Sequence, residues 1–262
     1  MKYGIIASIL DPELETAFKM GRELGFDGLE VPFNGLDYEQ EVLWTREGVQ
    51  QIRGLAEATG MEVPSCCAGR FNRLGFVNPD PEVREECVEI LLHLIDTCAE
   101  VGMQNILVAF FGDHEIETEE HKDLVVEAMR RCAPKAESRG ITLALEGTVT
   151  AEDFFEIIDR TESEALGVYY DVGNAVWLGY DGPAELRKIS DKGLLAQVHI
   201  KDMTAEKQNV PLGEGGVNWP AVADALREIE YDGYLVLETT GGDDRRAFAQ
   251  RHLAFIKSCI EG

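Results

Sequence analysis

Apolar and polar residues alternate along the chain in a pattern that predicts eight strand–helix units. Short apolar runs have the length and composition of strands, and each is followed by a loop and then by apolar residues spaced three and four apart, as in a helix. The predicted strands span residues 5–8, 28–31, 62–67, 105–110, 141–146, 166–171, 195–199 and 234–238.

The helical pattern is clearest between Asp80 and Gly102. Asp80 has the character of an N-cap, a proline occupies the first helical position after it, and Gly102 ends the pattern. The dipeptide Asp11-Pro12 gives the same signal before a helix that ends at Gly25. Thr150 with Asp153 resembles a capping box. Further helices are predicted around residues 45–59 and 118–139.

Regular alternation of strands and helices predicts parallel strands joined by right-handed crossovers. A doubly wound open sheet would also satisfy this pattern, but residues 7–11 after the first strand contain no glycine and therefore no dinucleotide fingerprint. Eight units in 262 residues, with no linker or change of composition, favour one α/β domain over residues 1–262. We therefore predict a single (β/α)8 TIM barrel.

Four successive predicted strands end in a residue that can bind a metal ion. These residues are Glu146, Asp171, His199 and Glu238. A buried strand should not end in a charged group without a partner, and the carboxyl ends of barrel strands converge on one face. One shared divalent cation is the simplest partner, and the oxygen-rich set favours Mn²⁺ or Mg²⁺ over Co²⁺ or Zn²⁺. The alternative is a salt-bridged barrel mouth without metal.

The charge balance excludes several classes of partner. The chain has 24 basic and 49 acidic residues, a formal net charge of −25. Nucleic acids and anionic membrane surfaces attract basic proteins, so neither is an expected partner. No apolar run approaches the roughly 20 residues that span a bilayer, and the N-terminus lacks the pattern of a signal peptide. We therefore predict a cytoplasmic protein.

The sequence at these strand ends resembles the sugar phosphate isomerase/epimerase branch of the xylose isomerase-like TIM-barrel superfamily. The resemblance covers essentially the whole chain and is sharpest at residues 145–146, 170–174, 198–202, 211–215 and 237–238. Relatives in that superfamily include ketohexose 3-epimerases, ulose-phosphate epimerases, hydroxypyruvate isomerase, and inosose isomerases and dehydratases. The resemblance implies an enzyme with a small sugar or polyol substrate and one divalent metal ion. Relatives often form dimers, so a homo-oligomer is possible.

The resemblance also implies that Glu146 and Glu238 are both metal ligands and an acid/base pair. A metal that chelates a carbonyl and the adjacent hydroxyl acidifies the C–H between them and stabilises the resulting ene-diolate. One carboxylate removes the proton, and the other returns it to the opposite face in epimerisation or to the neighbouring carbon in isomerisation. A hydride shift would need a second metal and further carboxylates, which the sequence does not offer.

The sequence departs from the ketohexose epimerases at Asn174, where those enzymes usually carry histidine. Asparagine can hydrogen-bond a sugar hydroxyl but cannot act as an acid or base. This difference argues against a free ketohexose and leaves phosphosugars and inososes as candidate substrates.

Lys201 lies on the same strand face as His199, so it could reach the substrate or balance the acidic site. The alternative for Lys201 is an ion pair with Asp202. The further substrate-binding candidates are Glu30, Arg70, His114 and Asp202.

Two rival functions remain at this point. A dehydratase of an inosose-type keto-polyol would remove the same acidic proton and expel a β-hydroxyl, so its product would differ by one water. A sugar-binding barrel without activity would be expected to lack one of the paired glutamates, but the sequence carries both Glu146 and Glu238.

Overall fold

The strands of the computed structural model pair in the closed order of a barrel. The structure describes residues 1–35, 37–239 and 243–262. The strand order around the barrel is β1-β10-β7-β6-β5-β4-β3-β2, which confirms the predicted (β/α)8 architecture. The barrel strands are β1 (Lys2–Ile6), β2 (Gly28–Pro32), β3 (Ser65–Ala68), β4 (Asn105–Phe110), β5 (Thr142–Gly147), β6 (Leu166–Asp171), β7 (Leu195–Ile200) and β10 (Tyr234–Leu237).

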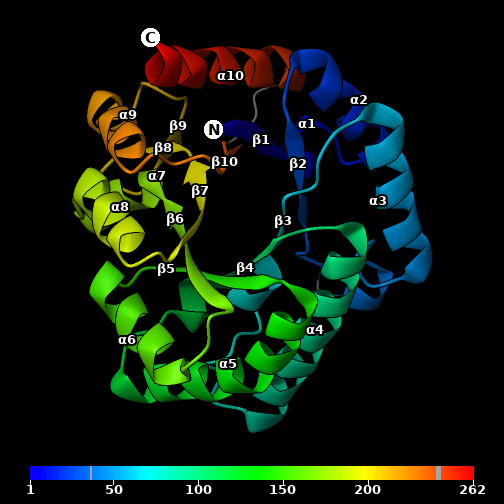
Figure 1. Cartoon of the computed structure of the whole chain (residues 1–262), viewed down its shortest axis with the longest axis vertical. Helices are drawn as coiled ribbons and strands as arrows, with labels where there is room; N and C mark the ends of the chain where they lie inside the picture. The colour runs from blue at the N-terminus through cyan, green and yellow to red at the C-terminus, as the bar shows by residue number, and fades with distance from the viewer. Residues whose placement is uncertain (36, 240–242) are drawn as a thin grey trace. The chain divides into compact units, whose positions relative to one another are not determined.

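Neighbouring barrel strands run parallel. β1 pairs with β2 and with β10 (Figure 1). In this register Ile5 lies opposite Leu29 on one side and Leu237 on the other. Parallel strands in a barrel are buried on both faces, which explains why these runs are almost continuously apolar. Successive side chains point to opposite faces, so residues two apart share a face.

Ten α-helices fall within the described residues, together with three short 3-10 helices and one small hairpin. The α-helices are α1 (Ala7–Leu10), α2 (Leu14–Leu24), α3 (Arg46–Thr59), α4 (Pro81–Val101), α5 (Glu119–Arg139), α6 (Ala151–Thr161), α7 (Val172–Leu178), α8 (Gly182–Asp191), α9 (Trp219–Glu228) and α10 (Arg245–Glu261). The 3-10 helices are η1 (Tyr38–Gln40), η2 (Gly69–Asn72) and η3 (Gly112–His114), and the hairpin consists of β8 (Asp202–Met203) and β9 (Asn209–Val210).

Two of the three predicted helix starts are confirmed. The Asp80 side chain accepts a hydrogen bond from the amide of Glu82, and Thr150 with Asp153 forms the complete capping box. The prediction that Asp11 is the N-cap of α2 was wrong, because the N-cap residue is Glu13. The Asp11 carboxylate instead accepts a hydrogen bond from the amide of Glu13. The chain therefore makes a local Asx turn before the helix begins.

Two strand boundaries also differ from the prediction. Residues 7 and 8, expected in the first strand, open the short helix α1, in which Ala7 and Leu10 are buried. The third strand begins at Ser65 instead of residue 62, with only an isolated bridge between Gly28 and Glu62 before it. Pro64 explains this delay, because proline has no amide hydrogen for the ladder.

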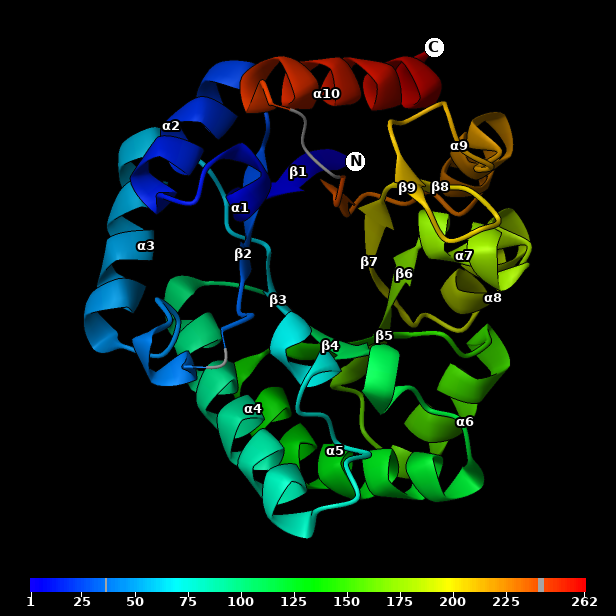
Figure 2. The same ribbon diagram turned by 180° about the vertical axis from the view of Figure 1, so that it is seen from behind.

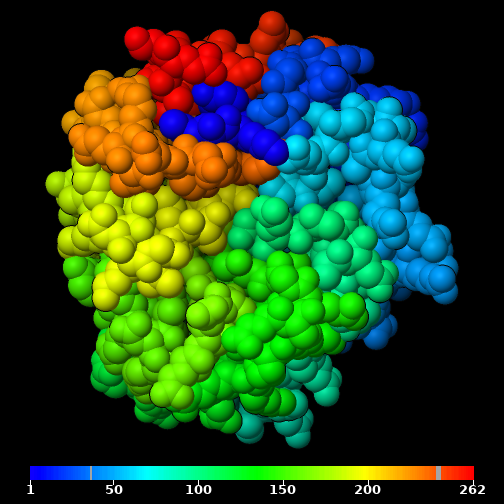
Figure 3. All heavy atoms as spheres, in the orientation of Figure 1, coloured from blue at the N-terminus to red at the C-terminus, as the bar shows by residue number. Residues whose placement is uncertain are grey.

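The chain divides into two compact units, and unit 1 comprises residues 1–31, 55–62 and 169–262. Within it, α10 packs against α1, α2 and α9, and Figure 2 shows α10 in red beside the blue helices. The first strand is held at its start by a hydrogen bond from the Lys2 amide to the Gly233 carbonyl, and Figure 3 shows this dark-blue segment against the orange one. No helix among the described residues is long and apolar enough to cross a bilayer.

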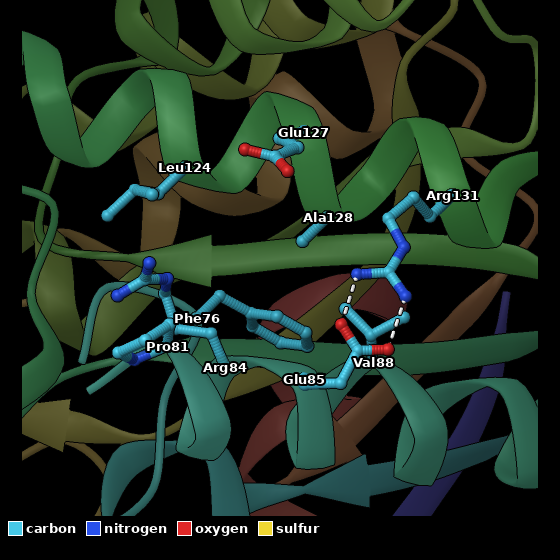
Figure 4. A pocket seen from close by; sticks show the side chains of 9 residues that line it. All are labelled: Phe76, Pro81, Arg84, Glu85, Val88, Leu124, Glu127, Ala128 and Arg131. Carbon is cyan, nitrogen blue, oxygen red and sulfur yellow. Dashed lines mark hydrogen bonds and ion pairs between the residues drawn. The ribbon is translucent and has the colours of Figure 1, made fainter. Parts of the chain in front are cut away.

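Unit 2 comprises residues 32–54 and 63–168. Its long helices α4 and α5 pack against each other and leave a groove of about 140 Å³ (Figure 4). Arg131 of α5 donates two hydrogen bonds, of 2.7 and 2.5 Å, to the carboxylate of Glu85 of α4 across this groove. Both side chains are partly exposed, so water screens this ion pair and its contribution to stability is small.

His252 of α10 is a buried imidazole in an apolar setting. His252 is 2% exposed, and its ring packs on the ring of Phe248 with the centroids 4.0 Å apart. Neither ring nitrogen has a hydrogen-bond partner among the described residues. Burial, followed by the charge of Arg251, lowers the pKa of His252 to about 4.

His252 should make the fold less stable at acid pH. The folded-state pKa of about 4 lies below the ordinary value of 6.5, so between these values the unfolded chain binds a proton that the folded chain does not. The free energy of unfolding should therefore fall by up to about 1.4 kcal/mol per pH unit from this residue as pH drops from about 6.5 towards 4. Urea unfolding of wild type and of His252→Phe over this range measures the effect; equal slopes would contradict it.

Candidate metal centre

Four side chains at the ends of β5, β6, β7 and β10 offer a cluster of metal ligands. They are Glu146, Asp171, His199 and Glu238, and one ligand atom from each lies within 4.8 Å of the others. Glu146, Asp171 and His199 are buried, and the Glu238 side chain is 33% exposed. Three carboxylates and one imidazole are donors that suit a divalent cation such as Mn²⁺, Mg²⁺ or Zn²⁺.

Asp171 is oriented by the helix that follows it. Its Oδ1 accepts hydrogen bonds from the amides of Gly173 and Asn174, at 2.8 and 2.7 Å, and so caps the first turn of α7. Because this bond pair fixes one oxygen, the other oxygen, Oδ2, is turned towards Lys201 and His199. Gly173 must be small, since an added Cβ would lie 2.5 Å from Cγ of Lys201.

His199 lies between two carboxylates, one near each nitrogen of its ring. Its Nε2 lies 2.8 Å from Oε1 of Glu30, and its Nδ1 lies 3.2 Å from Oε2 of Glu238. The side chains of His199 and Glu30 are both fully buried. A ligand histidine commonly directs its second nitrogen to a carboxylate in this way, which fits the ring for metal binding through Nδ1.

Lys201 balances the acidic cluster. Its Nζ lies 3.0 Å from Oδ2 of Asp171 and 2.8 Å from Oε2 of Glu238. Of the two roles expected from the sequence, charge balance is therefore the one that the contacts support. A contact of Lys201 with the substrate stays a prediction.

The charges around Glu238 keep its carboxyl group ionised. Burial alone would raise the pKa of Glu238, but the positive charges of Lys201 and then His199, with their hydrogen bonds, hold it well below the ordinary range. An ionised carboxylate can bind a cation and accept a proton, whereas a protonated one does neither.

Asp202 fastens the loop that follows the small hairpin. Its buried carboxylate accepts hydrogen bonds from the amides of Gly213, Gly215 and Val217, at 2.8 to 3.1 Å, and from Nε1 of Trp219 at 3.1 Å. The structure thus gives Asp202 a part in shaping the loop, and its contact with a substrate stays a prediction.

Asn174 is buried at the start of α7, where its Oδ1 accepts a hydrogen bond of 3.2 Å from Nε1 of Trp177. The ammonium of Lys207, at the turn of the hairpin, lies 4.0 Å from the centroid of the Trp177 ring. Asn174 thereby links α7 to the β8–β9 hairpin through the tryptophan.

Arg70 and His114 belong to unit 2 and are both buried. Arg70 donates to the Gly35 carbonyl at 2.8 Å, pairs with Glu86 at 3.2 Å, and lies over the Tyr38 ring. Nε2 of His114 lies 2.9 Å from the Arg73 carbonyl. The prediction that either binds substrate stays a prediction.

Two residues of the site were missed in the sequence. Tyr169 donates a hydrogen bond of 2.7 Å to Oε2 of Glu30, and Gln197 donates one of 2.7 Å to the hydroxyl of Tyr169. Tyr169 precedes Asp171 by two residues and Gln197 precedes His199 by two. Because residues two apart in a strand share a face, this spacing could have placed both residues on the face that carries the candidate ligands.

The chain is similar to named sugar epimerases in sequence and to several solved structures in fold. A putative L-ribulose-5-phosphate 3-epimerase of Escherichia coli K12 is 27% identical over 238 residues, which cover 84% of this chain and 81% of the relative. The solved structure of a D-tagatose 3-epimerase-like protein matches with a TM-score of 0.82 at 22% identity, covering 100% of this chain and 98% of that one. A structure of the IOLI protein with a bound zinc atom also has a TM-score of 0.82, at 17% identity, with the same coverage.

These relatives are named as enzymes of sugar epimerisation or share their fold, and the prediction that the chain is an enzyme is confirmed. The family model described as xylose isomerase-like TIM barrel matches residues 18–259. This match covers most of the 262 residues, and the chain therefore belongs to the xylose isomerase-like TIM-barrel family.

Proposed function

We propose that this protein is a divalent-metal-dependent epimerase or isomerase of a small ketose or ketose phosphate. The observation that carries the proposal is the cluster in which two glutamates, Glu146 and Glu238, accompany Asp171 and His199. Epimerisation beside a carbonyl removes a proton from one face of a carbon and returns it to the other, which requires two proton-transferring groups. Glu146 and Glu238 would serve as this pair.

The four clustered residues would hold the metal ion. A divalent cation bound there would supply Lewis acidity, which draws electron density from the substrate carbonyl and makes the adjacent C–H more acidic. Glu238, kept ionised by Lys201 and His199, is in the state that accepts a proton. Lys201 would orient the carboxylates of Asp171 and Glu238, which it contacts directly.

A phosphorylated ketopentose is the substrate to test first. The relatives that match at 26–27% identity are named as L-ribulose-5-phosphate 3-epimerases, and the chain covers 79–81% of their length. Asn174 in place of a histidine, as noted above, also argues for a substrate other than a free ketohexose. An inosose-type keto-polyol is the rival substrate, and loss of one water from the product would identify a dehydratase.

Metal binding should depend on Asp171. Titration of metal-stripped protein with Mn²⁺ should give one site per chain, and Asp171→Asn should weaken binding about 10-fold or more, because a charged ligand is lost. Asp181→Asn is the matched control, since Asp181 caps α8 through the amide of Ala184 and asparagine caps equally well. Isothermal titration calorimetry measures the affinities. Binding that ignores the Asp171 change would remove the proposed centre.

Turnover should depend on both glutamates. Glu146→Gln and Glu238→Gln each remove a proton-transferring carboxylate and should lower kcat by about 10²- to 10⁴-fold, while the thermal unfolding midpoint changes little. Glu164→Gln, at an exposed glutamate before β6, is the control and should keep wild-type turnover. Wild-type turnover in either of the first two variants would refute the two-carboxylate mechanism.

Solvent deuterium should appear in the product. A proton that passes through a carboxylate exchanges with the medium, so reaction in D₂O should place carbon-bound deuterium at the reacting centre. Mass spectrometry and proton NMR of product and recovered substrate measure the label. Complete turnover with no label at carbon would instead indicate hydride transfer or a proton that is shielded from exchange with the medium.

A further inference from the structure

A chain of three hydrogen bonds runs through the interior of unit 1 and ends on the ligand His199. Gln197 Nε2 donates to the Tyr169 hydroxyl at 2.7 Å, and that hydroxyl donates to Oε2 of Glu30 at 2.7 Å. The other oxygen of Glu30 lies 2.8 Å from Nε2 of His199. All four residues are at most 1% exposed, so no bulk water competes for these bonds.

The donors and acceptors in this series of hydrogen bonds can be assigned in only one way. The Tyr169 hydroxyl has a single hydrogen, and its short contact to Glu30 uses it, while its lone pair accepts from Gln197. An ionised carboxylate has no hydrogen to donate, so Glu30 accepts from both Tyr169 and His199. The hydrogen between Glu30 and His199 therefore belongs to Nε2 of the imidazole.

This assignment determines which nitrogen of His199 faces the acidic cluster as a ligand. Because Nε2 carries this hydrogen, Nδ1 is the nitrogen whose lone pair is left to bind a metal ion, which displaces any proton there. Nδ1 lies 3.2 Å from Oε2 of Glu238 and 3.9 Å from Oδ2 of Asp171. The ring packs tilted against Tyr169, with centroids 4.3 Å apart, which restricts its rotation.

We propose that Glu30, supported by Tyr169 and Gln197, is a positioning residue that fixes His199 in its Nε2–H tautomer and strengthens Nδ1 as the metal ligand. The negative charge of Glu30 increases the electron density on the ring, and the hydrogen bond from Tyr169 keeps that carboxylate in place. The inference rests on the proposed metal centre and gives Glu30 a role different from the substrate contact expected from the sequence.

The affinity test compares four proteins. Metal-stripped wild type, Glu30→Gln, Tyr169→Phe and Tyr170→Phe are titrated with Zn²⁺ by competition against a chromogenic chelator. Glu30→Gln keeps the shape of the side chain but loses the charge and one of the two acceptor oxygens, and should bind Zn²⁺ about 10- to 100-fold more weakly. Tyr169→Phe removes the support of Glu30 and should bind a few-fold more weakly, on the order of the cooperative strengthening in such chains.

Tyr170→Phe is the matched control. Tyr170 is the next residue of β6, is also buried, and donates a hydrogen bond of 2.9 Å to Glu185. Its side chain lies on the face of the strand opposite to Tyr169 and Asp171, and its bond to Glu185 is not one of the three bonds that lead to His199. Both tyrosine variants lose a buried hydroxyl, so both should unfold at a lower temperature than wild type. Tyr170→Phe should nevertheless bind Zn²⁺ with wild-type affinity.

A second measurement reads the tautomer directly. In the Zn²⁺ complex with ¹⁵N-labelled histidine, His199 should show a directly bonded Nε2–H that exchanges slowly with water, and Glu30→Gln should speed that exchange. An Nδ1–H form in wild type would overturn the proposal.

The remaining outcomes are also decisive. Wild-type affinity in Glu30→Gln, or equal affinity in the two tyrosine variants, would overturn this inference while leaving the metal centre intact. Failure of the wild-type protein to bind Zn²⁺ or Mn²⁺ would remove the metal centre itself. If Glu30→Gln does not fold, the comparison of Tyr169→Phe with Tyr170→Phe decides the question.

Discussion

The site depends on holding like charges together in a largely buried place. Carboxylates that approach one another in a medium of low polarity repel strongly, and each loses its hydration. The chain offsets this with fixed positive groups: the amides at the first turn of α7 bind Asp171, and the ammonium of Lys201 lies between Asp171 and Glu238. The start of α7 and the residue after β7 thus supply the groups that meet this requirement.

Because side chains alternate along the strands, the polar side chains of the site lie in two layers. Asp171 and His199 lie at the strand ends, and Tyr169 and Gln197 lie one period deeper on the same faces. Most barrel interiors are filled with branched apolar side chains. Here Tyr169 and Gln197 make part of the deeper layer polar, and their hydrogen bonds to each other and to Glu30 support the candidate ligand His199.

Patterns in the sequence were sufficient for the architecture and for the four side chains that the structure brings together, because strand period, helix caps and charged strand ends are local signals. The capping box at Thr150 was found for the same reason. The partnership of Glu30 with His199 joins residues 169 positions apart, and the bond of Tyr169 to Glu30 joins residues 139 apart. Such pairs depend on which strands face each other across the interior, which no local pattern specifies.

The loop held by Asp202 also limits how the protein can be altered. Its carboxylate binds donors on alternate residues of the loop, Gly213, Gly215, Val217 and Trp219. A Cβ on Gly215 would lie 2.2 Å from the Asp202 carboxylate, and one on Gly216 would lie 2.7 Å from Val176. Glu214 is exposed between these fixed points. A library intended to reshape this loop therefore has the side chain of Glu214 as its natural point of entry, because a substitution there keeps the spacing of the amides of Gly213 and Gly215 that donate to Asp202.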